Sequence, residues 1–244
     1  MMRSIVLAAF CLVACQVARA DSDVLWTIVH DRCVPGEQQS GTPDPCLLVD
    51  LSAGIANGYV VLKDRDGATQ LLVMPTAKIT GIEDPAVLAP GATNYFAMAW
   101  LQTPRVDALA HRELPRDALS LAVNSVTGRS QNQLHIHVDC LDAGVRETLK
   151  QHMAEIGDRW APLSVKLQGH SYLAMRVSGA WLSDKNPFRL LADGEPGAAA
   201  AMGQWTLAVA GATLADGSLG FVLLANHGIG AGAEELQDHA CHGL

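Results

Sequence analysis

Residues 131–140 read Gln-Asn-Gln-Leu-His-Ile-His-Val-Asp-Cys, and polar and apolar side chains alternate along them. A period of two is typical of a β-strand that is buried on one face only. Gln133, His135 and His137 then lie together on the polar face. Because imidazole is nucleophilic, titrates near neutral pH and binds metal ions, we expect the chemistry of the protein on this face.

Two histidines at this spacing have three interpretations. They can be surface residues, two ligands of zinc or copper, or groups that act on a phosphate. Residues 124–132, which precede the strand, favour the last, because their hydroxyl, amide and glycine groups can bind phosphate oxygens. Asn124, Arg129 and Ser130 are the candidates in this segment. Without an acidic cluster in the sequence nearby, we expect neither a metal ion nor a cofactor.

The strand is similar to the histidine triad motif, His-φ-His-φ-His-φ-φ, of nucleotide hydrolases and transferases. More narrowly, the chain resembles the bacterial CDP-diacylglycerol pyrophosphatases. The resemblance covers nearly all of the chain after its N-terminal region, in the same order as in the family. The matching segments are residues 58–64, 72–76, 124–125, 127–129, 159–160, 169–170, 172–174, 186–188, 221–225 and 237–239.

The resemblance implies a reaction and the residues that perform it. CDP-diacylglycerol would be hydrolysed at its pyrophosphate bond to CMP and phosphatidate, with His135 as the nucleophile and a covalent CMP–histidine as the intermediate. His137 would be the third member of the triad and, with Asn124 and Ser130, would hold the non-bridging phosphate oxygens. Gln133 stands where the family pattern has histidine. It can form hydrogen bonds but cannot titrate, which puts the rate and the pH profile in doubt more than the reaction type.

Charge and the remaining histidines add further expectations. The net charge of −8 and the pI near 5.5 argue against nucleic-acid binding, and they make Arg129 more useful for attracting an anionic substrate. His170 lies in a segment shared with the family and is either a substrate-site residue or a structural one. His239 and His242 flank Cys241, where we favour a disulfide over a metal site.

Two other functions remain open at this point. A nucleotidylyl transferase, or a hydrolase of other nucleotide conjugates, would use the same His135 intermediate. A periplasmic metal- or ligand-binding protein would carry His135 and His137 without any reaction. For the lipid substrate we expect a membrane surface as a partner, and the sequence does not indicate an oligomeric state.

The N-terminus predicts export. A short positive start, an apolar run over residues 4–14 and the small residues of Ala18-Arg19-Ala20 predict a signal peptide over residues 1–20, cleaved before Asp21. Two alternatives stay open: lipidation of Cys15 in a lipobox-like context, and an uncleaved N-terminal anchor. We therefore expect a periplasmic protein that either alternative would attach to the inner membrane.

Cysteine usage agrees with export. Beyond the N-terminal region the chain has Cys33, Cys46, Cys140 and Cys241, an even number that suggests two disulfides with three possible pairings. Cys33 and Cys46 bracket a Pro- and Gly-rich loop, which favours a local bridge. Cys140 and Cys241 then remain as the second pair.

The element pattern predicts an α+β fold for residues 21–244, taken as one catalytic domain. The resemblance implies a histidine-triad-like antiparallel sheet with packed helices, with a length that could hold a duplicated or elaborated version. We expect helices at 24–32, 94–109 (interrupted at Pro104) and 145–160, and strands at 58–63, 70–74, 119–124, 134–140, 164–177, 205–210 and 220–225. Residues 194–202 are expected to form a helix or a flexible crossing.

Overall fold

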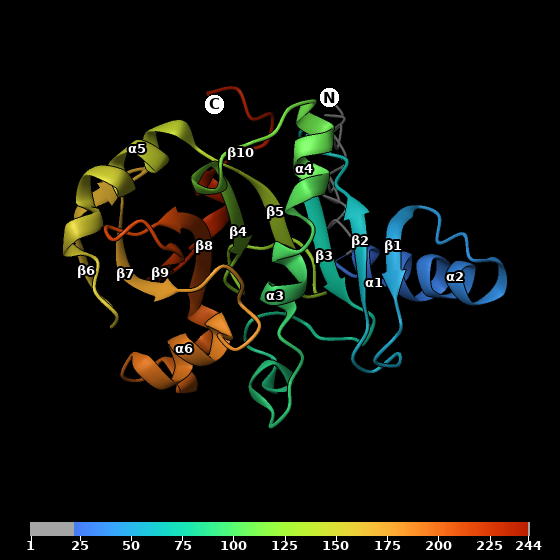
Figure 1. Ribbon diagram of the computed structural model, residues 1–244. Helices are drawn as coiled ribbons and strands as arrows, with labels where there is room; N and C mark the ends of the chain where they lie inside the picture. Colours follow the sequence, from blue (N-terminus) through green and yellow to red (C-terminus); the bar gives the residue numbers. More distant parts are fainter. Residues whose placement is uncertain (1–21, 244) are drawn as a thin grey trace, which may run out of the picture.

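The computed structural model of the protein describes residues 22–243 (Figure 1). The predicted signal peptide and Cys15 lie outside this range. Within it, helices and a ten-stranded sheet combine, so the α+β prediction is confirmed.

All strand pairs of the sheet are antiparallel, and the strand order is β1-β2-β3-β5-β4-β8-β9-β7-β6, with β10 paired to β5. β5, the histidine strand, therefore lies between β3 and β4 in the interior of the sheet. The bounds are β1 Cys46–Asp50, β2 Tyr59–Lys63, β3 Leu71–Pro75, β4 Leu119–Val123, β5 Ile136–Leu141, β6 Ala161–Leu167, β7 His170–Ser178, β8 Trp205–Thr213, β9 Leu219–His227 and β10 Gln237–Asp238.

The sheet repeats one topology twice. Strands β2, β3, β4 and β5 lie in the order 2-3-5-4, and β6, β7, β8 and β9 lie in the order 6-7-9-8. In each half a helical segment connects the second strand to the third, and the halves join where β4 pairs with β8. β9 takes the place of β5 in the second half, but its one histidine, His227, is its last residue. Within residues 22–243, a histidine pair is therefore found only in the first half, with His137 on the inner strand β5 and His135 directly before it.

The helices cover both faces of this sheet (Figure 1). α3 and α4 lie over β3 and β5. The N-terminal helix consists of α1 Val24–Ile28, a π-helical turn Val29–Cys33 and α2 Val34–Ser40, which are continuous with one another. The other helices are α3 Tyr95–Trp100, α4 Thr103–Ala110, α5 Ala143–His152 and α6 Pro187–Gly194. Short 3₁₀ turns include η7, Ala233–Leu236, close to the C-terminus.

The N-terminal helix is longer than the sequence predicts. It was expected to end at Arg32, with Pro35 and Gly36 in a loop, but helical structure continues to Ser40. Pro35 has no backbone N–H, and it directly follows the π-helical turn Val29–Cys33, where the regular α-helical hydrogen-bond pattern is already interrupted. The loop between Cys33 and Cys46 is correspondingly short.

The other helices and strands follow the predictions with shifted ends. The 94–109 helix breaks after Trp100 and restarts at Thr103, with Pro104 in the first turn of α4. The 145–160 helix begins at Ala143 and ends at His152. The expected strand 164–177 is a hairpin of β6 and β7, and residues 194–202 form short 3₁₀ turns. β1 and α6 were not predicted.

The apolar side chains form one large cluster on one face of the sheet and two smaller clusters on the other. Phe96, Trp100 and Phe188, from α3 and α6, belong to the large cluster with Ile136 and Val138 of β5. On the opposite face, one small cluster joins the N-terminal helix to β2 and β3, and the other joins α5 and η7 to β4, β8 and β9. His137 pairs directly with a residue of each small cluster, Leu72 and Ala122, so the polar face of β5 lies between them.

Both disulfides join the expected partners. Cys33–Cys46 ties the N-terminal helix to β1 across 13 residues, and Cys140–Cys241 ties β5 to the C-terminal segment across 101 residues. The local bridge favoured by the sequence is confirmed, and the second pair follows the same prediction.

We predict that the two bridges differ in their contribution to stability. Closing a loop lowers the entropy of the unfolded chain, by about 3 kcal/mol for a loop of about 15 residues and about 4.7 kcal/mol for one of about 100 residues. The Cys140→Ala/Cys241→Ala variant should therefore lose about 1–2 kcal/mol more unfolding free energy than the Cys33→Ala/Cys46→Ala variant. Urea unfolding at neutral pH measures both, and a larger loss for the short-loop variant would contradict the prediction.

Candidate active site

The polar face of β5 is fully covered, which the sequence did not indicate. His135 is 7% and His137 5% exposed, and Gln133 is completely buried. The prediction of a half-buried strand was therefore wrong. The face is covered because η7 and the residues that follow it fold back over it, burying Ala233 and Leu236.

His135 has a single favoured tautomer. Its Nδ1 lies 2.6 Å from the backbone oxygen of Gln133, two residues back on the same segment. A carbonyl oxygen can only accept a hydrogen bond, so Nδ1 carries the proton and Nε2 keeps its lone pair. Burial lowers the pKa of His135, which keeps the ring neutral and Nε2 available as a nucleophile.

His137 presents the opposite nitrogen as a donor. Its Nδ1 lies 2.9 Å from Nε2 of Gln70, and the same amide nitrogen donates to Glu234 Oε1 at 3.0 Å. Only the amide nitrogen of Gln70 can donate to the carboxylate of Glu234, so this nitrogen also faces His137. His137 Nδ1 therefore accepts a hydrogen bond, and its Nε2 carries the proton. Burial, followed by the neighbouring His135, lowers the pKa of His137 to about 3.

His137 is on β5 and His135 directly precedes this strand, and the two imidazoles are neighbours. Their ring centroids are 5.0 Å apart, edge to face at 70°. Among residues 22–243, the buried Nε2 of His137 has no hydrogen-bond partner, although Glu234 Oε2 is 3.4 Å away. A ring with an available lone pair and a ring with an unpartnered N–H are thus neighbours, which suits a nucleophile next to a donor for a phosphoryl oxygen.

Glu234 closes this site from η7. Its carboxylate accepts a hydrogen bond from Asn124 Nδ2 at 3.0 Å, and its backbone N–H donates to Asn124 Oδ1 at 3.3 Å. Burial raises the pKa of Glu234, but the interaction with His137, the hydrogen bonds from Gln70 and Asn124 and the charge of His239 together outweigh burial, so the pKa is lowered. At neutral pH the group is a carboxylate.

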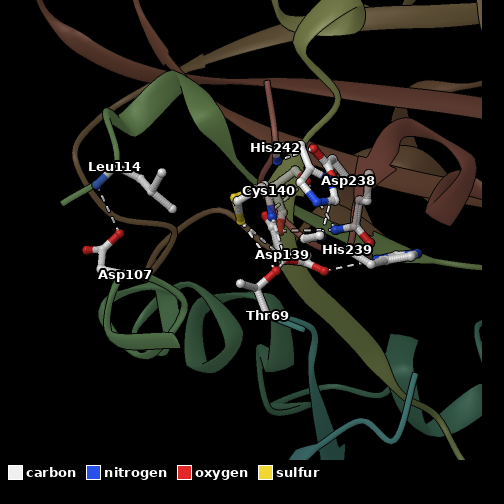
Figure 2. Close-up of a disulfide and its surroundings, with 12 residues drawn as sticks. Thr69, Asp107, Leu114, Asp139, Cys140, Asp238, His239 and His242 are labelled. Atoms are coloured by element: carbon white, nitrogen blue, oxygen red, sulfur yellow. Dashed lines mark hydrogen bonds and ion pairs between the residues drawn. A yellow bond between two sulfur atoms is a disulfide. The ribbon is translucent and has the colours of Figure 1, made fainter. Parts of the chain in front are cut away.

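A second histidine contacts Glu234 from the C-terminal segment. His239 Nε2 lies 3.5 Å from Glu234 Oε1, and His239 Nδ1 lies 2.9 Å from Oδ2 of the fully buried Asp139. Thr69 Oγ1 and the backbone N–H of Cys140 donate to the other oxygen of Asp139 (Figure 2). The hydrogen bond to Asp139 raises the pKa of His239, so its imidazolium form is favoured.

Two glycines permit the close approach of the covering segment. Gly67, in the β2–β3 turn with φ of +73°, lies so close to His239 that a side chain would collide with it. The backbone oxygen of His239 accepts hydrogen bonds from the N–H groups of Ala68 and Thr69 in the same turn. Gly128 leaves no room for a Cβ beside the backbone oxygen of Ala231, which Ser125 binds through its N–H and its hydroxyl.

The predicted site residues are only partly brought together. His135, His137 and Asn124 share one site, and Gln133 lies beside it, with its side-chain amide donating to the backbone oxygens of Pro75 and Ala77. Ser130 is exposed.

Arg129 and His170 have partners outside the cluster. Arg129 forms a bidentate ion pair with Glu83, at 2.6 and 2.7 Å. His170, on β7, pairs with Glu235 at 2.7 Å, and Tyr172 donates to the same carboxylate oxygen. A substrate-binding role for Ser130, Arg129 and His170 stays a prediction.

Sequence reasoning missed three residues of the site: Gln70, Glu234 and His239. No local pattern marks Gln70 or Glu234, which meet His137 only through the fold of distant segments. His239 did carry a signal. Pairing Cys140 with Cys241 brings the residues beside these cysteines together, and Asp139 and His239 are among them.

One group of residues has the composition of a metal site. Asp139, Cys140 and Cys241 are the potential ligands that lie close together within the described part of the chain. Both cysteines are joined in a disulfide and offer no thiolate. This arrangement therefore does not fit a thiolate-bound metal ion.

A family model described as CDP-diacylglycerol pyrophosphatase matches residues 20–244. The chain belongs to this family. It is accordingly a hydrolase of phospholipid metabolism, and CDP-diacylglycerol is the substrate that the family implies. The family implies that the bond cleaved in the substrate is a diphosphate bond.

The structure also bears on the compartment. Two disulfides are typical of exported proteins, because they persist in oxidising compartments. Between residues 22 and 243, no helix is long and apolar enough to cross a bilayer.

The Asp139–His239 contact makes stability depend on pH. The pKa of His239 is above its ordinary 6.5 in the folded state, so the stabilisation is fully present below pH 6.5 and is lost as pH rises through the folded-state value. His239→Asn keeps a donor near Asp139 without the charge. We predict that the loss of unfolding free energy in this variant is largest near pH 5 and shrinks toward pH 9.

Urea unfolding of both proteins at several pH values measures this difference. His242→Asn is the control, because His242 is on the same segment but 84% exposed. A loss in His239→Asn that grows with pH would contradict the assignment.

Proposed function

We propose that this protein hydrolyses CDP-diacylglycerol to CMP and phosphatidate through a covalent CMP–histidine formed on His135. The observation that carries the proposal is the hydrogen bond from His135 Nδ1–H to the Gln133 carbonyl, which leaves Nε2 unprotonated. The resemblance of the strand to the histidine triad supports the same role for its central histidine. Gln133 acts through this carbonyl, so a glutamine at its position is compatible with the reaction.

In the first step, Nε2 of His135 attacks the phosphorus next to cytidine. A nitrogen–phosphorus bond forms, the bridging phosphorus–oxygen bond breaks, and phosphatidate departs with the electron pair of that bond. Phosphate is a good leaving group, so the step needs no strong acid. The free N–H of His137 is placed to donate to a non-bridging oxygen, where negative charge is held during the displacement.

In the second step, water attacks the same phosphorus and gives up a proton as the new phosphorus–oxygen bond forms. The nitrogen–phosphorus bond breaks, its electron pair returns to His135 Nε2, and CMP leaves. Dividing one difficult displacement into two easier ones is the advantage of covalent catalysis. In this proposal the phosphate is also bound by Asn124, Ser130 and Arg129, whereas His170 lies outside the histidine cluster. The lipid substrate brings the protein to a periplasmic membrane surface.

The central test follows CMP release from CDP-diacylglycerol in detergent micelles, with the disulfide-bonded protein. Since His135 is the nucleophile, His135→Ala should lower the rate by about 1000-fold or more. His137→Gln keeps a donor but shifts its position and should cost about 10- to 100-fold. A parallel reaction with chelator tests the expectation that activity needs no divalent ion.

Trapping provides the direct readout. The wild-type protein, quenched in alkaline denaturant, should carry CMP on the peptide that contains His135, and His135→Ala should carry none. If His135→Ala retained activity, or if CMP were bound to another residue, the mechanism would be wrong. Transfer of CMP to an added alcohol in preference to water would point to a transferase instead.

A further inference from the structure

Glu234 lies between two histidines that belong to different parts of the chain. Its Oε2 is 3.4 Å from Nε2 of His137, and its Oε1 is 3.5 Å from Nε2 of His239. His137 is in turn the ring neighbour of His135, at 5.0 Å between centroids. The carboxylate is thus one side chain away from the nucleophile.

The position of Glu234 is fixed by the fold. The neighbouring Ala233 and Leu236 are completely buried, and the backbone oxygen of Leu236 accepts a hydrogen bond from Asp142. Asn124 binds both the carboxylate and the backbone N–H of Glu234. The carboxylate is therefore a built part of the site rather than a loose side chain on a loop.

Solvent reaches Glu234 but hardly reaches the histidines of β5. The side chain of Glu234 is 34% exposed, whereas that of His137 is 6% exposed. A water molecule that attacks a phosphoryl group on His135 has to lose a proton as it attacks. A carboxylate at the boundary between solvent and the buried histidines is well placed to accept it.

Gln133 cannot serve this purpose. Its amide cannot titrate, and both hydrogen bonds of its Nε2 go to the backbone oxygens of Pro75 and Ala77. His137 presents a proton rather than a lone pair on its Nε2. Gln133 and His137 therefore leave the role of proton acceptor to a residue of another segment.

We propose that Glu234 is the general base that accepts a proton from the hydrolytic water, and that His239, anchored by Asp139, is the positioning residue that holds Glu234 ionised and in place. The proposal rests on the covalent mechanism proposed above. In the step itself, the water oxygen bonds to phosphorus and its proton passes to Glu234. The bond from phosphorus to His135 breaks with its electrons returning to nitrogen, and Glu234 then releases the proton to solvent.

Several titratable and charged groups surround Glu234 and His239. His137 faces Glu234 from β5 and His239 faces it from the C-terminal segment, while the amides of Gln70 and Asn124 are neutral. Asp139 contacts His239 directly, and Asp64 of the β2–β3 turn adds negative charge nearby. The imidazolium of His239 favours the ionised form of Glu234, so the rate of the second step should fall at acid pH as Glu234 becomes protonated.

Glu234→Gln tests the role of the base. It retains the shape of the side chain, an acceptor for Asn124 and the nucleophile His135, while its amide nitrogen faces Gln70 and His239 in place of a carboxylate oxygen. Phosphatidate release in the first turnover should stay close to the wild-type rate, whereas steady-state CMP release should fall by about 100-fold or more. Protein-bound CMP should accumulate toward one per chain in an alkaline quench.

The matched control is Glu235→Gln, the same chemical change at the next position, where the carboxylate contacts His170 and Tyr172 instead of the site. No bound CMP should accumulate in it. His239→Asn provides a second measurement, independent of how well Glu234→Gln folds. Without the imidazolium, the acid limb of the kcat profile should move to higher pH, a shift that a purely structural role does not produce.

These experiments distinguish a failure of the role proposed for Glu234 from a failure of the covalent His135 mechanism. If wild type forms the His135 adduct but Glu234→Gln turns over within threefold of wild type, or slows both steps equally, Glu234 is not the base. An unchanged acid limb in His239→Asn would contradict its positioning role. If no adduct forms in any variant and His135→Ala remains active, the covalent mechanism fails and the inference fails with it.

Discussion

The buried polar face of β5 is the constraint on which the rest of the structure depends. His135, His137 and Asp139 lie in the interior, where a polar group without a partner costs about 1–3 kcal/mol. Each therefore has a specific partner: the Gln133 carbonyl, the Gln70 amide, and Thr69 with His239. These partners come from the histidine segment itself, from the start of β3 and from the last residues of the chain. The burial of this face therefore depends on contacts from all three places.

The C-terminal segment consequently belongs to the site although it is far away in sequence. The Cys140–Cys241 disulfide holds it against β5, next to the Asp139–His239 contact (Figure 2). Gly67 lets the segment approach the β2–β3 turn, and the backbone oxygen of His239 completes that turn. The disulfide and the hydrogen bond thus hold the C-terminal segment at the same place on β5.

Local patterns in the sequence predicted much of the fold. The alternation in residues 131–140 predicted a strand, which the structure has as β5 from Ile136. The strands expected at 58–63 and 70–74 are β2 and β3, and Pro104 marked the break between α3 and α4. Such patterns cannot show whether a polar face is covered. The covering contacts join residues about a hundred positions apart, such as Asn124 with Glu234, and nothing in the local sequence marks Glu234. The extension of the N-terminal helix through Pro35 was missed because proline usually ends a helix, whereas here it follows a π-helical turn that already interrupts the regular hydrogen-bond pattern.

The topological repeat gives the sheet two inner strands, β5 and β9, but in the part of the chain that the structure describes the histidine pair lies at β5 alone. Both halves place an inner strand between two neighbours, but β9 carries apolar residues where β5 carries histidines, so the second half extends the sheet and contributes η7 to the cover. The central claim is a double displacement at the cytidine phosphorus. It is tested most directly by the stereochemistry of hydrolysis of a chiral α-phosphorothioate analogue of CDP-diacylglycerol in ¹⁸O water. A covalent His135 intermediate predicts net retention at that phosphorus, and inversion would contradict it by showing direct attack of water.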